Sequence, residues 1–317
     1  MIYKFFLIFL LSLTFQVHAS KLNEISAFNF TEEQIQLAIE IIQKLESNHL
    51  VKKDYREIKN EAFEVFIERL DPNKNIYTNQ EVLKVLNNIK TDSDIREDFQ
   101  IAYDLFNRYI DRYKERYEVQ IEFLKEIDED DLQGDRKIER LLSEASRQIS
   151  SDDLRSLWQD LSTNDVIQLM LAGNSLDESV EKTIKRMNNQ LNYFQQTRRE
   201  DVFDIFINSI ASIYGPHTAY MSPKTSEDFD INMSLSLEGI GALLSSDGLY
   251  TSISSLVPGG PAEKTDTLKP EDKIIGVGQD AEGEIVDVIG WRIDDVVDLI
   301  RGPKGSIVRL KIIPSTA

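Results

Sequence analysis

The chain has 317 residues, of which 41% are hydrophobic and 29% are charged, a composition typical of a folded globular protein. Its formal net charge of −19, without a long basic run, argues against nucleic acid or an anionic membrane surface as partner. The absence of cysteine excludes thiol catalysis, disulfides and thiolate metal sites, and we expect neither a metal nor a cofactor. The length exceeds one typical core and predicts two domains plus a targeting segment.

The N-terminus has the features of a secretory signal peptide. Lys4 is the only charge before Ala19, and the apolar run Phe5–Phe15 is too short to span a bilayer. The triplet Val17-His18-Ala19 matches a small-x-small cleavage site. We therefore expect residues 1–19 to be removed after Ala19, which would place the mature chain of a Gram-negative cell in the periplasm without a stable membrane anchor. An uncleaved membrane anchor is the alternative.

Apolar residues recur at helical spacing from about Thr31 to Ile213, which predicts one helical domain over residues 20–213. The expected helices lie at about residues 31–45, 55–70, 78–89, 94–129, 136–147, 152–171 and 176–214. Three pairs have the spacing of an N-terminal capping box: Thr31 with Gln34, Thr78 with Glu81, and Ser175 with Glu178.

The expected helix at 94–129 carries tyrosines at helical spacing, namely Tyr103, Tyr109, Tyr113 and Tyr117. An aromatic stripe suits stacking on nucleic-acid bases, but in an acidic chain such a stripe is more typical of a buried core. The acidic run Glu126–Asp131 does not place oxygen ligands at the alternating positions of a calcium loop. We interpret it as a solvated helix end.

Residues 214–233 form a turn-rich connector that contains the sequence GPHTAYMSP. This sequence loosely echoes LDPNKNIY at residues 70–77, because each joins a helix end to a proline turn and a tyrosine. As a catalytic base, His217 would need a nucleophile and an orienting partner, and the sequence assigns neither. We expect it to be a structural histidine.

The pattern changes to short strands and tight turns over residues 234–317. The stretch Leu235–Leu244 reads LSLEGIGALL, and its glycines predict a bend or a close approach by another backbone. Further strands are expected at about residues 249–257, 273–277, 284–289 and 307–313, with helices at about 261–264 and 294–301. We predict a small, partly open β-barrel with two helices.

Four motifs in this region resemble a PDZ domain of the secreted bacterial type. They are GIGA at 239–242, VPGGPAEK at 257–264, EDKIIGVG at 271–278, and VIGWRIDDVVDLIRGPKGSIVRL at 288–310. With the two proline-turn sequences of the helical region, the chain resembles the N-terminal part of a tail-specific protease, also called a C-terminal processing peptidase of the S41 type. That family has a signal peptide, a helical region, a PDZ domain and then a serine peptidase domain with a Ser/Lys dyad.

This resemblance implies a substrate-recognition portion of a periplasmic serine endopeptidase. The family's catalytic serine and lysine would lie beyond Ala317, so we expect no catalytic residue in this chain and no peptide hydrolysis by it alone. The alternative is a non-catalytic, secreted PDZ scaffold protein. A PDZ module of a trypsin-like protease is disfavoured, because those proteins place the catalytic domain where this chain has helices.

The PDZ resemblance implies that a peptide C-terminus binds between the strand after Gly241 and the helix from about Ile293. Backbone N–H groups of the loop would bind the carboxylate, and the strand would pair with the peptide backbone. One apolar face of the helix would determine which peptide side chains are preferred. The expected peptide-binding residues are Gly239, Ile240, Gly241, Ala242, Leu244, Ile293, Val297 and Ile300. Val296 and Leu299 would face the core, although both stripes are apolar and the faces are interchangeable on sequence alone. The expected partners are protein substrates with apolar C-termini, and a periplasmic adaptor protein is a further candidate.

Overall fold

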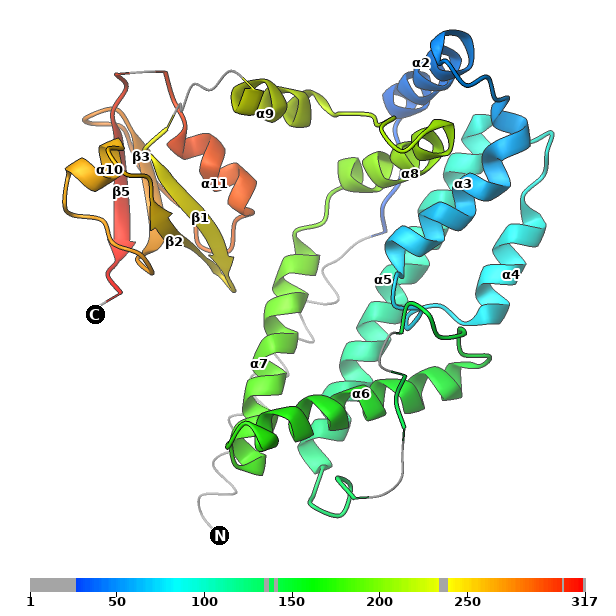
Figure 1. Cartoon of the computed structure of the whole chain (residues 1–317), viewed down its shortest axis with the longest axis horizontal. Helices are drawn as coiled ribbons and strands as arrows, with labels where there is room; N and C mark the ends of the chain where they lie inside the picture. Colours follow the sequence, from blue (N-terminus) through cyan, green and yellow to red (C-terminus); the bar gives the residue numbers. More distant parts are fainter. Residues whose placement is uncertain (1–26, 134–136, 140–141, 234–238, 304, 316–317) are drawn as a thin grey trace. The chain divides into compact units, whose positions relative to one another are not determined.

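The computed structural model describes residues 27–133, 137–139, 142–233, 239–303 and 305–315 (Figure 1). These residues divide into two compact units, which we describe separately: a helical unit, up to residue 187 and over 198–220, and a sheet unit, over 188–197 and from residue 221 onward. The expected signal peptide lies outside the described residues. No helix among those described is long and apolar enough to cross a bilayer.

The helical unit contains six helices and the start of a seventh among its described residues. They are α2 (Glu32–Asn48), α3 (Tyr55–Leu70), α4 (Asn79–Asn88), α5 (Ile95–Glu126), α6 (Ser151–Leu171), α8 (Arg199–Tyr214) and the first part of α7 (Leu176–Gln195). All three expected capping boxes form, with reciprocal hydrogen bonds in the pairs Thr31–Gln34, Thr78–Glu81 and Ser175–Glu178.

Aromatic side chains from α3, α5 and α8 form the core of the helical unit. Phe99 of α5 packs edge-on against Phe206 of α8, with ring centroids 5.1 Å apart. Tyr103 and Tyr117 are buried, which confirms that the tyrosine stripe belongs to the core. The remaining tyrosines of the stripe, Tyr109 and Tyr113, are half-buried.

The loop after α3 is organised by one buried carboxylate, that of Asp71. It accepts backbone N–H bonds from Asn75 at 2.9 Å, Ile76 at 3.2 Å and Tyr77 at 3.1 Å, and it forms an ion pair with Arg147. Because this ion pair fixes the chain near Arg147, the loop LDPNKNIY is tied to a segment more than sixty residues away.

The prediction of a helix at 136–147 is wrong. The residues described in this range form turns and irregular backbone. Tertiary bonds hold the end of this segment and the residue after it. Lys74 Nζ donates to the Ala145 carbonyl at 3.0 Å, and the Asn79 N–H donates to the Gln148 carbonyl at 2.8 Å. Both bonds tie this segment to residues at or shortly before the start of α4.

The single helix expected at 176–214 is instead two helices, α7 and α8. The turn between them is closed by bonds from the Gln196 N–H to the Tyr193 carbonyl and from the Thr197 N–H to the Phe194 carbonyl, both 3.1 Å. The carboxylate of Asp201 then accepts the Arg198 N–H at 2.7 Å and caps the start of α8. The break coincides with the passage of the chain from the sheet unit back to the helical unit.

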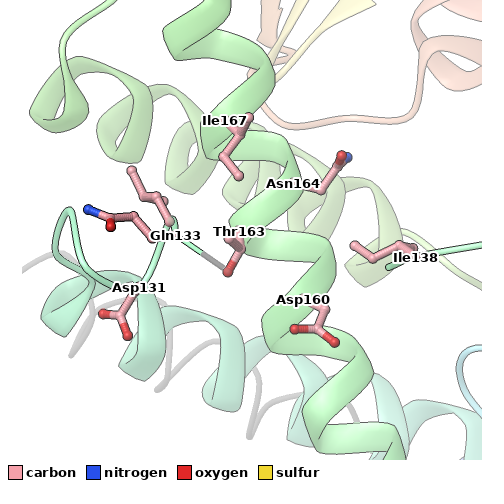
Figure 2. A pocket seen from close by; sticks show the side chains of 8 residues that line it. Asp131, Gln133, Ile138, Asp160, Thr163, Asn164 and Ile167 are labelled. Carbon is pink, nitrogen blue, oxygen red and sulfur yellow. The ribbon is translucent and has the colours of Figure 1, made fainter. Parts of the chain in front are cut away.

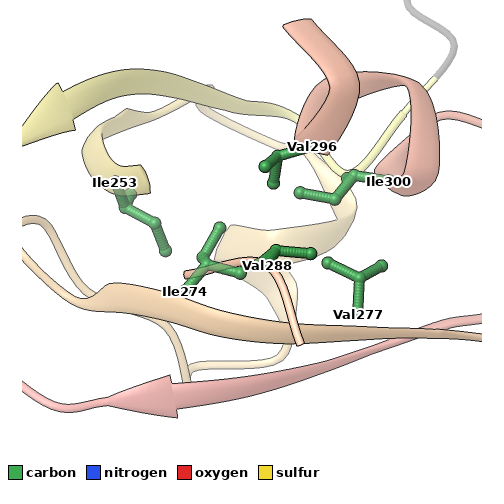
Figure 3. Packing of buried hydrophobic residues seen from close by; sticks show 6 residues of the cluster. All are labelled: Ile253, Ile274, Val277, Val288, Val296 and Ile300. Carbon is green, nitrogen blue, oxygen red and sulfur yellow. The ribbon is translucent and has the colours of Figure 1, made fainter. Parts of the chain in front are cut away.

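The sheet unit is built on a five-stranded antiparallel sheet with the order β1-β2-β3-β4, and β5 pairs with β3. Its strands are β1 (Ala242–Asp247), β2 (Tyr250–Leu256), β3 (Lys273–Gln279), β4 (Ile285–Asp287) and β5 (Val308–Ile313), and its short helices are α10 (Pro261–Lys264) and α11 (Ile293–Ile300). Side chains from the strands and α11 meet in one core, shown in Figure 3: Ile253, Ile274, Val277, Val288, Val296 and Ile300.

The connector at 214–233 contains a helix that the sequence analysis missed, α9 (Pro223–Met233). Pro223 occupies its first position, and the Ser222 hydroxyl accepts the Thr225 N–H at 3.3 Å as an N-terminal cap. The strand expected at Leu235–Leu244 begins at Ala242 in the structure, and residues 234–238 lie outside the described residues. Gly239–Gly241 are therefore a loop that leads into β1.

Candidate functional site: a groove between an edge strand and a helix

The loop Gly239–Gly241 is held by its carbonyl groups. The Ala262 N–H donates to the Ile240 carbonyl and the Val257 N–H donates to the Gly241 carbonyl, each at 2.8 Å. Among the described residues, no loop or turn bond takes the N–H of Ile240 or Gly241. The loop is thus anchored through its acceptors in the described part of the chain.

Gly241 must be glycine for two separate reasons. Its φ of 74° lies in the left-handed region, and a Cβ would lie 3.1 Å from Gly260 Cα and 3.2 Å from Pro261 Cδ. This confirms the expected close approach of another backbone, and the approaching segment is the VPGGPAEK motif. The position of that motif under the loop is set by packing that the motif itself does not indicate.

Strand β1 lies at an edge of the described sheet, where its only described strand partner is β2. Ala242 and Leu244 pack against the core, whereas Leu243 between them is 61% exposed. A register irregularity falls between Leu243 and Leu244. An edge strand presents unpaired backbone groups, so β1 can accept an additional strand.

Helix α11 packs over this sheet, and its faces differ in part from the expected division. Val296 lies in the core as expected, but Ile300 is only 5% exposed and joins it there. Ile293 and Val297 are half-buried, and Leu299 packs at the margin of the core. Since Val296 and Ile300 are four residues apart, they share the inner stripe. The expected placement of Ile300 on the outer stripe is therefore corrected, and the peptide-binding role of all these residues stays a prediction.

The ends of α11 lie beside the two ends of β1. At the loop end, the Arg301 side chain lies 4.0 Å from where a Cβ of Gly239 would be. At the opposite end, the Gly290 N–H donates to the Leu249 carbonyl at 2.7 Å, just after β1 ends at Asp247. α11 and β1 therefore run antiparallel side by side, with the glycine loop at one end. We refer to the space that a peptide would take between them as the groove.

A pocket of about 740 Å³ opens behind the glycine loop. Its lining is mainly apolar and includes Ile240, Leu268, Ile300 and Ile307. Ile240 and Ile300 therefore line this pocket at the loop end of the groove.

A smaller, polar pocket of about 200 Å³ lies in the helical unit, between α6 and the segment after α5. Figure 2 shows Asp160, Thr163 and Asn164 of α6 on one side and Asp131 on the other. Among the described residues, no group of three or more His, Cys, Asp or Glu side chains could hold a metal ion.

His217 is exposed in the loop that follows α8. Its neighbour Thr218 contacts His49 Nε2 at 2.9 Å, and the Asn208 side chain pairs with both backbone groups of Tyr220. These contacts hold the loop 215–220 against the helical unit.

Comparisons with known proteins match both parts of the chain. The model described as "Tail specific protease N-terminal domain" matches residues 41–224, and the PDZ domain model matches residues 228–313. The fold is therefore a helical N-terminal region followed by a PDZ domain. Since the first model covers more than half of the sequence, the chain belongs to the tail-specific protease family.

Individual relatives agree with this assignment. A tail-specific protease of Haemophilus influenzae is 37% identical over 292 residues, which cover 89% of this chain and 41% of that relative. The carboxy-terminal processing protease CtpA of Bacillus subtilis is 33% identical over 141 residues, covering 44% of this chain and 28% of that relative. This chain thus spans less than half the length of either curated relative.

One similar solved structure is the PDZ domain of the carboxy-terminal protease from Vibrio cholerae in complex with a peptide. It is 59% identical and covers 25% of this chain and 81% of that chain, with a TM-score of 0.25.

Proposed function

We propose that this chain recognises the C-termini of protein substrates for a periplasmic serine endopeptidase. The observation that carries the proposal is the glycine loop, whose carbonyls are held by Val257 and Ala262 while the N–H groups of Ile240 and Gly241 have no described loop partner. These donors stand at the start of an edge strand, beside an apolar helix. That arrangement suits a terminal carboxylate followed by an extended, apolar peptide.

The carboxylate of the substrate would accept two or three of the N–H bonds of Ile240, Gly241 and Ala242. A hydrogen bond to a charged group contributes roughly 1.5–3 kcal/mol, so this set is enough to separate a chain end from an internal peptide bond. The upstream residues would pair with β1 through backbone bonds, which tolerate many sequences. Ile293 and Val297 on α11 would favour small or apolar side chains.

Cleavage would be performed by the part of the complete protein that corresponds to the remaining length of the relatives. There, by family resemblance, a serine attacks the peptide carbonyl, a lysine acts as its base, and an acyl-enzyme forms. We propose that the present chain binds substrate without cutting it. The absence of a basic run and the net charge of −19 fit a protein ligand better than nucleic acid.

The proposal is tested with the purified mature chain and a fluorescent peptide that ends in Ala-Ala. Fluorescence anisotropy should show saturable binding of the free acid, and amidation of the C-terminus should abolish it. Equal affinity for the acid and the amide would contradict carboxylate recognition. Incubation with casein should leave casein intact, and turnover that survives removal of contaminants would show that this chain is itself catalytic.

A further inference from the structure

The end of α7 and the turn after it belong to the sheet unit, although they are separated from the PDZ segment in the sequence. Residues 188–197 of this stretch contact the sheet unit at two places. Asn189 Oδ1 lies 3.0 Å from the position that a Cβ of Gly248 would take, directly after β1. Gln196 contacts the residues that lead into α11. Both contacts are at the end of the groove opposite the glycine loop.

Gln196 makes its contacts through both its side chain and its backbone. Its Nε2 donates to the Gly290 carbonyl at 3.0 Å and lies 3.5 Å from the Trp291 carbonyl. Its own carbonyl accepts a bond from Arg292 Nη1 at 3.4 Å. Arg292 is the residue immediately before α11, so these bonds act on the entry to the helix.

The same entry is tied to β1. The Gly290 N–H donates to the Leu249 carbonyl at 2.7 Å, while the Gly290 carbonyl accepts from Gln196. Gly290 thus connects the turn after α7, the turn after β1 and the start of α11. A shift of Gly290 changes the distance between α11 and β1, which are the two walls of the groove.

We propose that Gln196 is a positioning residue for peptide recognition: through Gly290 it sets the separation of α11 and β1 at the end of the groove that receives residues upstream of the peptide C-terminus. This inference rests on the proposed function. A peptide whose carboxylate lies at the glycine loop, before the start of β1, runs antiparallel to β1 and places its upstream residues near the end of β1. Gln196 therefore acts on the upstream peptide residues and leaves carboxylate recognition unchanged.

The chain supplies a matched control at the preceding position. Gln195 has the same side chain, but its Nε2 is buried without a hydrogen-bond partner among the described residues. Substitution by methionine at either position keeps the side-chain length and removes the amide. Gln196→Met removes the bond to Gly290, whereas Gln195→Met removes no described bond.

The experiment measures dissociation constants of the full mature chain for an eight-residue peptide and a three-residue peptide with the same apolar C-terminus. For Gln196→Met, we expect the dissociation constant of the eight-residue peptide to rise about fivefold, the range of one net hydrogen bond. The three-residue peptide should change by less than about twofold. The ratio between free-acid and amidated peptide should stay at its wild-type value. Gln195→Met should bind both peptides as the wild type does.

Hydrogen exchange provides a readout that general destabilisation does not reproduce. In Gln196→Met, exchange should accelerate in the first turn of α11 and stay unchanged in β2 and β3. Asn189→Ala, which removes the second contact, should weaken the eight-residue peptide in the same selective way.

The positioning role would be overturned if Gln196→Met bound the eight-residue peptide with wild-type affinity. It would also be overturned if both peptides lost affinity equally and hydrogen exchange accelerated throughout the sheet unit. A wild-type chain that fails to bind either free-acid peptide would instead refute the proposed function, which keeps the two failures distinct.

Discussion

Gly241 and Gly260 lie with their backbones in direct contact. A Cβ on Gly241 would be 3.1 Å from Gly260 Cα, and a Cβ on Gly260 would be 3.2 Å from Gly241 Cα. Such distances are shorter than ordinary van der Waals contact, so neither position accepts a side chain without a backbone shift. The contact places the VPGGPAEK segment directly under the loop that we propose binds the substrate carboxylate.

Gly241→Ala should therefore abolish carboxylate recognition. The substitution forces a Cβ into Gly260 and Pro261 and places alanine at φ 74°, so we expect at least a tenfold loss of affinity for the free-acid peptide. Gly259→Ala is the control, because its φ is 75° but a Cβ there would meet no atom within 4 Å. It should lower the free energy of unfolding by about 1 kcal/mol and retain binding. Retained binding by Gly241→Ala would contradict the role of this contact.

Substitutions on the inner and outer stripes of α11 should have different effects: the inner one on stability and the outer one on peptide binding. Val296 is completely buried, so Val296→Ala should lower the free energy of unfolding by about 2 kcal/mol in a urea titration. Val297 is half-buried, so Val297→Ser should cost less stability and should weaken binding of peptides with apolar C-termini severalfold. Unchanged affinity of Val297→Ser across peptides with different terminal residues would remove Val297 from the groove wall.

A buried ion pair links α3 and α5 in the helical unit. Lys59 Nζ lies 3.4 Å from Asp98 Oδ2, and Asp98 also accepts bonds from Tyr55 and Ser93 hydroxyls at 2.9 and 2.7 Å. Burial, as the main cause, and the charge of Asp98, as the second, raise the pKa of Tyr55 well above its ordinary value. The Tyr55 hydroxyl therefore stays protonated and donates its hydrogen bond to Asp98.

Lys59→Met should destabilise the chain by about 3 kcal/mol, because it leaves the charge of Asp98 buried and without its cation. The double variant Lys59→Met/Asp98→Leu should lose at least about 1 kcal/mol less than the sum of the single variants. Chemical denaturation of the four proteins measures this coupling. Additive losses would show that the two side chains do not stabilise each other.

The carboxyl of Asp204 on α8 should give the helical unit a pH-dependent stability. Burial, then the neighbouring Asp201 and Glu200, raise its pKa from 3.8 to about 6. The folded chain therefore holds this proton more tightly than the unfolded chain. The resulting stabilisation is complete below about pH 4 and is lost as the pH rises through 6.

Asp204→Asn should consequently raise the free energy of unfolding at pH 7 by about 1 kcal/mol, a value reduced for solvent screening because the side chain is partly exposed. At pH 4 the variant and the wild type should be equally stable. Thermal unfolding at both pH values provides the measurement. A benefit that is the same at pH 4 and pH 7 would exclude the titration of Asp204 as its cause.

Local signals predicted most of the helical unit. The pairs Thr31–Gln34 and Thr78–Glu81 mark helix starts because each cap is made by residues three positions apart. The helix expected at 136–147 does not form among the described residues, where Arg147 pairs with Asp71 and the Ala145 carbonyl accepts a bond from Lys74. A sequence pattern contains no record of such bonds.

Two other differences are the break between α7 and α8 and the presence of α9. The break between α7 and α8 contains no proline or glycine, and Gln196 within it contacts Gly290 far along the chain. The start of α9 did carry a readable signal, since Ser222-Pro223 combines a capping residue with a proline at the first helical position.

The candidate site was likewise predicted only in part from the sequence. The motifs predicted the glycines beside a strand and a nearby helix, but the inner position of Ile300 depends on how α11 is rotated over the sheet. Two apolar stripes on one helix leave that rotation undetermined. The role of Gly260 beneath the loop was likewise set by three-dimensional packing, although its motif was visible.

The central claim is that backbone N–H groups of the glycine loop receive a substrate's terminal carboxylate. Amide NMR of the mature, isotope-labelled chain during titration with a peptide ending in Ala-Ala tests it most directly. We predict the largest shifts at Ile240, Gly241 and Ala242, with smaller shifts along β1, and their loss when the peptide is amidated. Equal shifts with acid and amide, or shifts that spare these three amides, would contradict the account.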